Sequence, residues 1–217
     1  MNGPSGGPDV VCAGPADLEV LSDVIAEAFH RLAVSRWLIA DPDARSCIFP
    51  GYFRLLVAYA IVAGLAHTTP GRDAVALWLP AGPGVSGPPT SHRERLAAVT
   101  APWTGRFAVF DQALEAHHPA GVPHEHLAIL AVRPGCQGRG LGAALLTARH
   151  RDLDRDGVPA YLEASSPRAR DLYLRHGYTV RPGSAFRLPE GPLLWPMWRE
   201  PRARTEGREG CREPGWM

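Results

Sequence analysis

The sequence predicts one folded domain of mixed α/β class. Hydrophobic residues make up 45% of the 217 residues, which is enough to bury a sizeable core in a domain of ordinary size. Segments with helical spacing of apolar residues alternate with short apolar segments along most of the chain. An almost wholly apolar run at 127–132 ends at Pro134, which is typical of a central strand buried on both faces.

The first half of this domain is expected to contain two helices and three strands. Apolar residues repeat at helical spacing in 15–29 and 45–63, and Gly64 is placed to end the second helix. The expected strands are 10–12, 65–68 and 74–79, the last two forming a β-hairpin around a turn at 69–73.

The second half begins with a glycine- and proline-rich loop at 81–90. The elements expected after this loop are helices at 93–99 and 107–117, the buried strand 127–132, a helix from Leu141 that stops at Gly157, a strand at 160–164, a helix capped by Ser165 or Ser166 that ends at Gly177, and closing strands at 185–188 and 193–198.

The two ends of the chain differ from its middle in amino-acid composition. The last stretch is rich in Arg, Glu, Gly and Pro and has little to bury. We expect a folded domain at 10–199 between disordered tails at 1–9 and 200–217. The first residues lack the features of a signal peptide, and no run approaches the roughly 18 apolar residues of a membrane span, so a cytoplasmic protein is expected.

The composition limits the classes of molecule that the chain is expected to bind. The net charge is +1 and charged residues make up 21%, so no strong field recruits nucleic acid or a membrane surface. Composition alone indicates a small-molecule or local peptide partner, of which we expect a small-molecule amine, and we expect a monomer or homodimer. The chain has no lysine, which excludes Schiff-base chemistry by a lysine.

No metal site or disulfide framework is expected. The cysteines Cys12, Cys47, Cys136 and Cys211 are scattered without a C-x-x-C pair. His124 and His126 share one face of a strand and His117-His118 lie nearby, but no third ligand accompanies them at a recognised spacing.

Three glycines mark the junction between the buried strand and the next helix. Gly138, Gly140 and Gly142 leave backbone N–H groups free at a helix N-terminus, where a diphosphate is the natural ligand. No Gly-Lys-Ser/Thr is present, and the G-x-G-x-G spacing differs from a dinucleotide fingerprint. A glycine-rich connector that binds nothing is the alternative.

The segment Val132-Arg133-Pro134-Gly135-Cys136-Gln137-Gly138-Arg139-Gly140-Leu141-Gly142 resembles the V-x-P-x-x-Q-x-x-G-x-G motif of the GNAT N-acetyltransferase superfamily. A second block, from Tyr161 to Tyr178, resembles the later strand and helix of that family. Among members of this superfamily, residues 157–180 and 188–192 look most similar to puromycin N-acetyltransferase and related actinobacterial enzymes. The resemblance implies a mostly antiparallel, splayed sheet of about seven strands with about four or more helices.

This resemblance also implies roles for particular residues, with acetyl-CoA as the cosubstrate. The backbone of Leu130, Ala131 and Val132 would pair with the pantetheine arm, and an N–H there would polarise the thioester carbonyl. The amides of Gln137, Gly138, Arg139, Gly140, Leu141, Gly142 and Ala143 would hold the pyrophosphate. Tyr173 matches the general acid that protonates the departing sulfur, although it could instead be an ordinary core tyrosine.

The amine must lose a proton, and several groups near the cleft could accept it. Glu163 is the first candidate and Glu125 the next, with His124 and His126 also within range. Each could equally be an ordinary group at the end of a strand. The expected activity is acetyl transfer to the primary amine of a small molecule, such as an antibiotic or secondary metabolite, by direct attack in a ternary complex. The alternatives are a protein or peptide amine as acceptor, or a non-catalytic acyl-CoA-binding module.

Overall fold

The computed structural model describes residues 7–202. The tails expected at 1–9 and 200–217 therefore lie mostly outside the described residues. The described residues form, in chain order, β1 (Val11–Cys12), a 3-10 turn (Pro15–Asp17), α1 (Leu18–Phe29), α2 (Ala33–Leu38), α3 (Pro42–Ala63), β2 (Leu65–Thr68), β3 (Ala74–Ala81), α4 (Thr90–Val99), α5 (Thr104–His117), β4 (His124–Val132), α6 (Leu141–Asp156), β5 (Ala160–Ala164), α7 (Pro167–Arg175), β6 (Thr179–Val180), β7 (Phe186–Arg187) and β8 (Leu193–Arg199).

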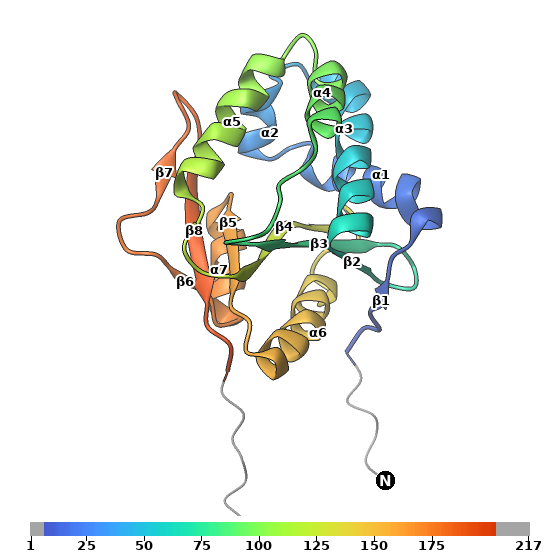
Figure 1. The fold of residues 1–217 in the computed structure, drawn as a ribbon. Coiled ribbons are helices and arrows are strands. Elements are labelled where there is room, and N and C mark those ends of the chain that lie inside the picture. Colours follow the sequence, from blue (N-terminus) through green and yellow to red (C-terminus); the bar gives the residue numbers. More distant parts are fainter. Residues whose placement is uncertain (1–6, 203–217) are drawn as a thin grey trace, which may run out of the picture.

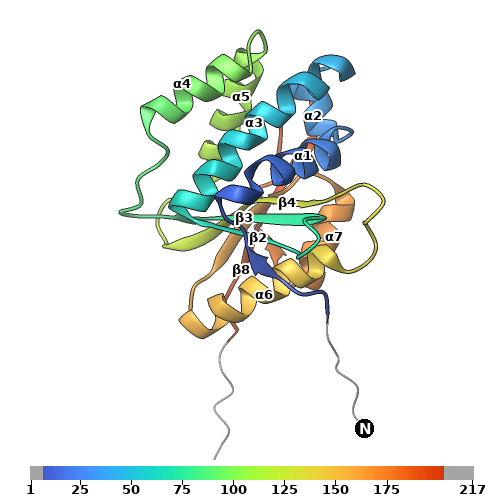
Figure 2. The ribbon, with the colours of Figure 1, turned by 90° about the vertical axis from the view of Figure 1, so that its right-hand side faces the viewer.

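The strands form one mixed sheet in the order β1-β2-β3-β4-β5-β8-β6, with β7 paired to β8. All neighbours are antiparallel except β4 and β5, which are parallel. Figure 1 shows α1 to α5 above this sheet and α6 below it, and Figure 2 shows the same layers from the side. The predicted mixed, mostly antiparallel sheet flanked by helices is confirmed.

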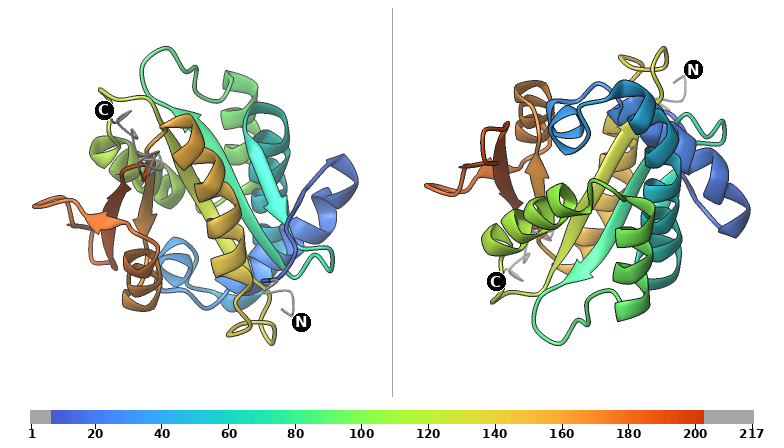
Figure 3. Two further views of the ribbon diagram at one scale, coloured as in Figure 1. Left: turned by 90° about the horizontal axis from the view of Figure 1, so that it is seen from below. Right: turned by 90° about the horizontal axis from the view of Figure 1, so that it is seen from above.

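The sheet opens between β4 and β5. The two strands pair only through Glu125 with Ala160 and His126 with Tyr161, and beyond these residues β5 pairs with β8 alone. Figure 3 shows the strands separating and, in the view from above, α5 passing over the region where they diverge. The resemblance implied this splayed pair of strands, and the structure contains it.

A hydrophobic core lies on each face of the sheet. The upper core joins α1, α3 and α5 to the sheet through fully buried residues such as Leu21, Phe49 and Val57. The lower core packs α6 and α7 against it around Trp78 and Leu145, both 0% exposed. Burying one such side chain stabilises the fold by about 1.5–3 kcal/mol, so the two layers hold the open strands in place.

Helix α3 differs from its prediction in two respects. It begins at Pro42 rather than residue 45, because the Asp41 side chain accepts hydrogen bonds from the backbone N–H groups of Asp43 and Ala44. By length and hydropathy alone its 22 residues could also cross a membrane, contrary to the expectation that no segment could. In this fold it packs on α1, β2 and β3, with Phe53 in the upper core.

Two elements were not predicted. Helix α2 has only six residues, fewer than two full turns, and strand β6 has two. Such short segments lack the repeats that reveal periodicity, and both are held by packing on neighbouring segments.

Candidate active site

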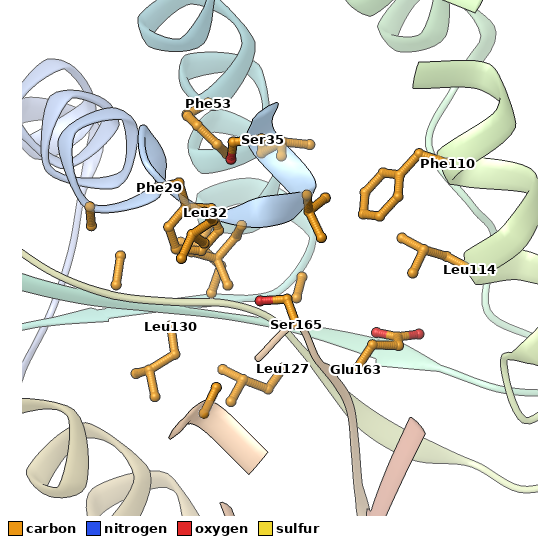
Figure 4. Close-up of a pocket in the computed structure, with 18 of the residues that line it drawn as sticks. Phe29, Leu32, Ser35, Phe53, Phe110, Leu114, Leu127, Leu130, Glu163 and Ser165 are labelled. Carbon is orange, nitrogen blue, oxygen red and sulfur yellow. The ribbon is translucent and has the colours of Figure 1, made fainter. Parts of the chain in front are cut away.

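A cavity of about 380 Å³ lies where β4 and β5 diverge. Its walls come from α1, α2, α3 and α5 above, from β4 along the floor, and from β5 and α7 at the side. Figure 4 shows the Glu163 carboxylate below Phe110 and Leu114 of α5, with Phe29 and Phe53 at the opposite side. One continuous space therefore joins the candidate residues of β4, β5 and α7.

A β-bulge turns part of β4 toward this cavity. Leu77 of β3 pairs with Ile129 and Trp78 pairs with Leu127, which leaves Ala128 without a partner in β3. Ala128 is exposed in the cavity, so the prediction that this strand is buried on both faces is wrong at this point. The exposure results from the separation of β4 from β5.

The glycine-rich loop at the end of β4 presents unused donors. Among the described residues, none of the backbone N–H groups of 137–143 donates to a protein acceptor. Gly138 and Gly140 have φ of +80° and +78°, a conformation that L side chains rarely adopt. Helix α6 begins at Leu141, so its positive N-terminal end lies in this loop and favours an anion.

The other residues predicted to hold the cofactor lie around the same loop. Leu130, Ala131 and Val132 line the cavity together with Gln137, whose amide donates to the Val132 carbonyl at 3.3 Å. Gly142 and Ala143 are half-buried in the first turn of α6, and Arg139 is exposed. The structure thus brings the predicted cofactor residues together along one edge of the opening.

Tyr173 lies on α7 and reaches the cavity from the side of β5. The helix begins at Pro167, where the Ser166 hydroxyl accepts from the backbone N–H of Ala169 at 3.2 Å. The Tyr173 side chain is 8% exposed, and burial raises the pKa of its phenol. Tyr173 therefore stays protonated at neutral pH and can donate a proton into the cavity.

Glu163 lies on β5 with its carboxylate in the cavity. Its side chain is 7% exposed, and its Oε2 is 2.9 Å from Nε2 of His126 on β4. Burial opposes the charged form, but the charge and hydrogen bond of His126 outweigh it, and the pKa of Glu163 is lowered. Glu163 is thus ionised at neutral pH, with the His126 imidazole beside it.

His118 joins this pair from the end of α5. Its Nδ1 is 3.9 Å from Oε1 of Glu163, and its Nε2 is 3.1 Å from Nε2 of His124. Burial, together with nearby His126, lowers the pKa of His118 to about 4. The sequence did not single out His118 for this position, because only the packing of α5 above β5 brings it to Glu163.

Glu125 does not take part in this arrangement. Its carboxylate binds Arg149 of α6, with Oε1 2.8 Å from Nη2, and it does not line the cavity. One residue along β4 reverses the side of the sheet that a side chain faces, so Glu125 and His126 lie on opposite faces. The hypothesis that Glu125 is a base is therefore not supported by the geometry.

The part of the cavity beneath the helices is mainly aromatic and aliphatic. The aromatic residues there are Phe29, Phe49, Tyr52, Phe53, Tyr59 and Phe110. Asp111 is the acidic group that α5 contributes, and burial, with a smaller contribution from Glu115, raises its pKa to about 6. The sequence predicted neither Asp111 nor the aromatic set, because these residues belong to helices without a recognisable motif.

Known proteins share this arrangement to different extents. Residues 105–180 match a family model described as an acetyltransferase (GNAT) domain. Mycothiol acetyltransferases of Streptomyces avermitilis and Beutenbergia cavernae are 42% and 49% identical to the chain over 55 residues. Each match covers 24% of this chain but only 18% of the relative.

A solved structure is similar over nearly the whole chain. It is described as histone acetyltransferase HPA2 and related acetyltransferase from Corynebacterium glutamicum, and it is 28% identical with a TM-score of 0.67. The similarity covers 92% of this chain and 99% of that one. The fold and the order of the elements around the cavity are therefore those of known acetyltransferases.

Proposed function

We propose that this chain, whose residues 105–180 belong to the GNAT acetyltransferase family, transfers an acetyl group from acetyl-CoA to the primary amine of a small molecule. The observation that carries the proposal is that one continuous cavity lies between β4 and β5. It is lined by residues of β4 and Gln137 and also by Glu163 and Tyr173. Both substrates can therefore meet in one space, and direct attack needs no covalent enzyme intermediate.

The unused amides of 137–143 suit the pyrophosphate of coenzyme A, because donors at a helix N-terminus attract an anion. The bulge at Ala128 and the separation from β5 leave the backbone of 128–132 available to the pantetheine arm and the thioester. A backbone N–H that donates to the thioester oxygen would stabilise the negative charge that develops there, an effect worth about 3–4 kcal/mol for one donor.

Two side chains supply the proton transfers. Glu163, held by His126, accepts the proton that the amine loses as its nitrogen forms the bond to the acetyl carbon. Tyr173 donates its proton to the sulfur as the carbon–sulfur bond breaks. The two groups lie on β5 and α7 and line the same cavity, so both are available to one transfer.

The acceptor is inferred to be a small amine with an apolar, aromatic-sized body. Such a body matches the Phe, Tyr and Leu side chains beneath the helices, while Asp111 and Glu163 favour a cationic amino group. Phe110 and Leu114 of α5 lie above Glu163, which leaves less room for an extended peptide. An amine-bearing antibiotic or secondary metabolite belongs to this class.

We also infer that the enzyme is cytoplasmic, because Cys12, Cys47 and Cys136 are free thiols.

The proposal is tested by incubating the protein with acetyl-CoA and a panel of amines while free thiol is measured. We expect thiol release with aromatic or alkyl primary amines and much less with polar amines or peptides. Efficient turnover of peptides alone would support the protein-acceptor alternative. Tight acetyl-CoA binding without thiol release from any acceptor would instead indicate a non-catalytic acyl-CoA-binding module.

A further inference from the structure

Three potential metal ligands meet beside the cavity. They are His118 at the end of α5, His126 on β4 and Glu163 on β5, and one ligand atom from each lies within 4.8 Å of the others. Their side chains are 25%, 18% and 7% exposed. Two imidazoles and a carboxylate form a common ligand set for zinc.

Hydrogen bonds determine which atom of His118 carries a lone pair. Nδ1 of His124 is 2.7 Å from the Val122 carbonyl, which can only accept, so Nδ1 carries the hydrogen. Nε2 of His124 must then accept from Nε2 of His118, 3.1 Å away. Nδ1 of neutral His118 is therefore left with a lone pair.

That lone pair faces another acceptor. His118 Nδ1 is 3.9 Å from Glu163 Oε1, and this buried oxygen has no hydrogen-bond partner among the described residues. The hydroxyl of neighbouring Tyr161 donates to the His117 carbonyl at 3.3 Å. His118 Nδ1 and Glu163 Oε1 are both acceptors, and a cation between them would satisfy both.

The spacing suits a metal ion. Zinc binds nitrogen and oxygen at about 2.0–2.2 Å, so two ligand atoms across one ion lie no more than about 4.2 Å apart. The separation of 3.9 Å between His118 and Glu163 falls within this limit. The hydrogen bond from His118 to His124 also resembles the outer contacts that orient metal-bound histidines.

We propose that His118, His126 and Glu163 form a binding site for a divalent transition metal ion, with Zn²⁺ the best match. His126 Nε2, 2.9 Å from Glu163 Oε2, becomes the third ligand when the metal displaces the hydrogen between them and the neutral imidazole keeps its one hydrogen on Nδ1. Bound metal occupies the lone pairs of Glu163, so that it can no longer accept the proton of the amine. Zn²⁺ would then inhibit acetyl transfer, an effect that rests on the proposed function.

Binding is measured by calorimetry on the full chain without a histidine tag or coenzyme A, after its thiols have been alkylated. We expect one Zn²⁺ per chain, with affinity lowered at least about tenfold in His118→Ala and in Glu163→Gln. The control His92→Ala changes a histidine of α4 that packs against Tyr59, outside this cluster, and should bind Zn²⁺ like the wild type. Circular dichroism establishes that each variant is folded.

A second measurement uses wild-type protein alone. Co²⁺ bound by two imidazoles and a carboxylate with few waters should absorb visible light more strongly than hydrated Co²⁺, and Zn²⁺ should displace it. Absence of saturable Zn²⁺ binding, or equal affinity in wild type and His118→Ala, overturns the site.

The inhibitory role is tested by following the acetylated amine rather than free thiol, because thiols bind zinc. We expect Zn²⁺ to stop turnover and EDTA to restore it. Zinc binding at this cluster with unchanged turnover overturns the inhibitory role. If the protein lacks turnover even without metal, the proposed function fails while the binding result stands on its own.

Discussion

Glu163 and Glu125 lie on adjacent strands, but their surroundings give them different chemistry. Glu163 faces the cavity beside two histidines, whereas Glu125 faces α6 and is held by Arg149. An ion pair in that position contributes to stability, and it lies outside the cavity. The role of each carboxylate thus follows from the face of the sheet on which it lies.

Glu163→Gln should lower kcat/KM about 10²–10³-fold, because the amide keeps the shape but cannot accept the proton. The matched control is Glu125→Gln, which should reduce the free energy of unfolding with little effect on turnover. Steady-state kinetics and thermal denaturation of both variants measure the two effects. Equal losses of turnover would contradict the separate roles.

Tyr173→Phe should lower kcat about 10²-fold while the affinity for acetyl-CoA stays nearly unchanged, because only the proton donor is lost. Tyr178→Phe is a suitable control. Its ring centroid is 5.7 Å from that of Tyr173, and its hydroxyl oxygen lies 3.1 Å from Nε2 of His150, away from the cavity. Turnover that is unaltered in Tyr173→Phe would remove this tyrosine from the mechanism.

At the scale of elements, the loop between β4 and α6 combines two properties. Its glycines adopt backbone conformations open to few other residues, and its amides remain without protein partners. The same segment therefore ends a strand, begins a helix and presents a row of donors. These properties are local, so the sequence motif was enough to predict where the loop and helix begin.

Gly138→Ala should weaken acetyl-CoA binding about tenfold or more, because the left-handed backbone is strained and its amides turn away from the phosphates. Gly84→Ala provides a matched control. Gly84 has φ of +82° and open space around it, but it belongs to the loop between β3 and α4. Calorimetric titration with acetyl-CoA should show a loss only for Gly138→Ala, and similar losses in both would indicate a general effect of strain.

The acceptor side could not be predicted from the sequence in this way. Helix α2 is too short to show periodicity. Asp111 of α5 and His118, which follows α5, show no motif in the sequence, and only tertiary packing brings them to the cavity and to Glu163. The sequence showed no third metal ligand for the same reason, because His118 and Glu163 are 45 positions apart and only the fold brings them together. Nearby motif residues were predictable, whereas groups assembled from distant helices were not.

At the scale of the whole molecule, the two cores hold an open sheet. Helices α1 to α5 cover one face and α6 and α7 the other, while β4 and β5 pair with each other only through Glu125 with Ala160 and His126 with Tyr161. Packing above and below therefore maintains a cavity that backbone pairing alone would close. Stability and the shape of the site depend on the same layers.

The lower layer should make the protein sensitive to acid. His150 of α6 is 6% exposed, and burial, with smaller contributions from Arg199 and His176, lowers its pKa to about 3. Below pH 6.5 the unfolded chain takes up a proton that the folded state refuses, so stability falls as the pH falls toward 3. At pH 5 this histidine alone should cost up to about 2 kcal/mol.

Denaturant unfolding at pH 7 and pH 5 measures this effect. His150→Gln should lose less stability between the two values than the wild type does. His30→Gln, on the opposite side of the sheet near Pro42, should behave like the wild type. An unchanged pH dependence in His150→Gln would show that His150 is not the group responsible.

The most direct test of acetyl transfer in the β4–β5 cavity is to locate the acetyl group after one turnover. Protein is mixed with equimolar acetyl-CoA and an aromatic primary amine, and both protein and amine are analysed by mass spectrometry. Direct attack predicts that the amine gains one acetyl group while the protein gains none, and that Glu163→Gln slows this gain. An acetyl group retained on the protein, or an unmodified amine with acetyl-CoA bound, would contradict it.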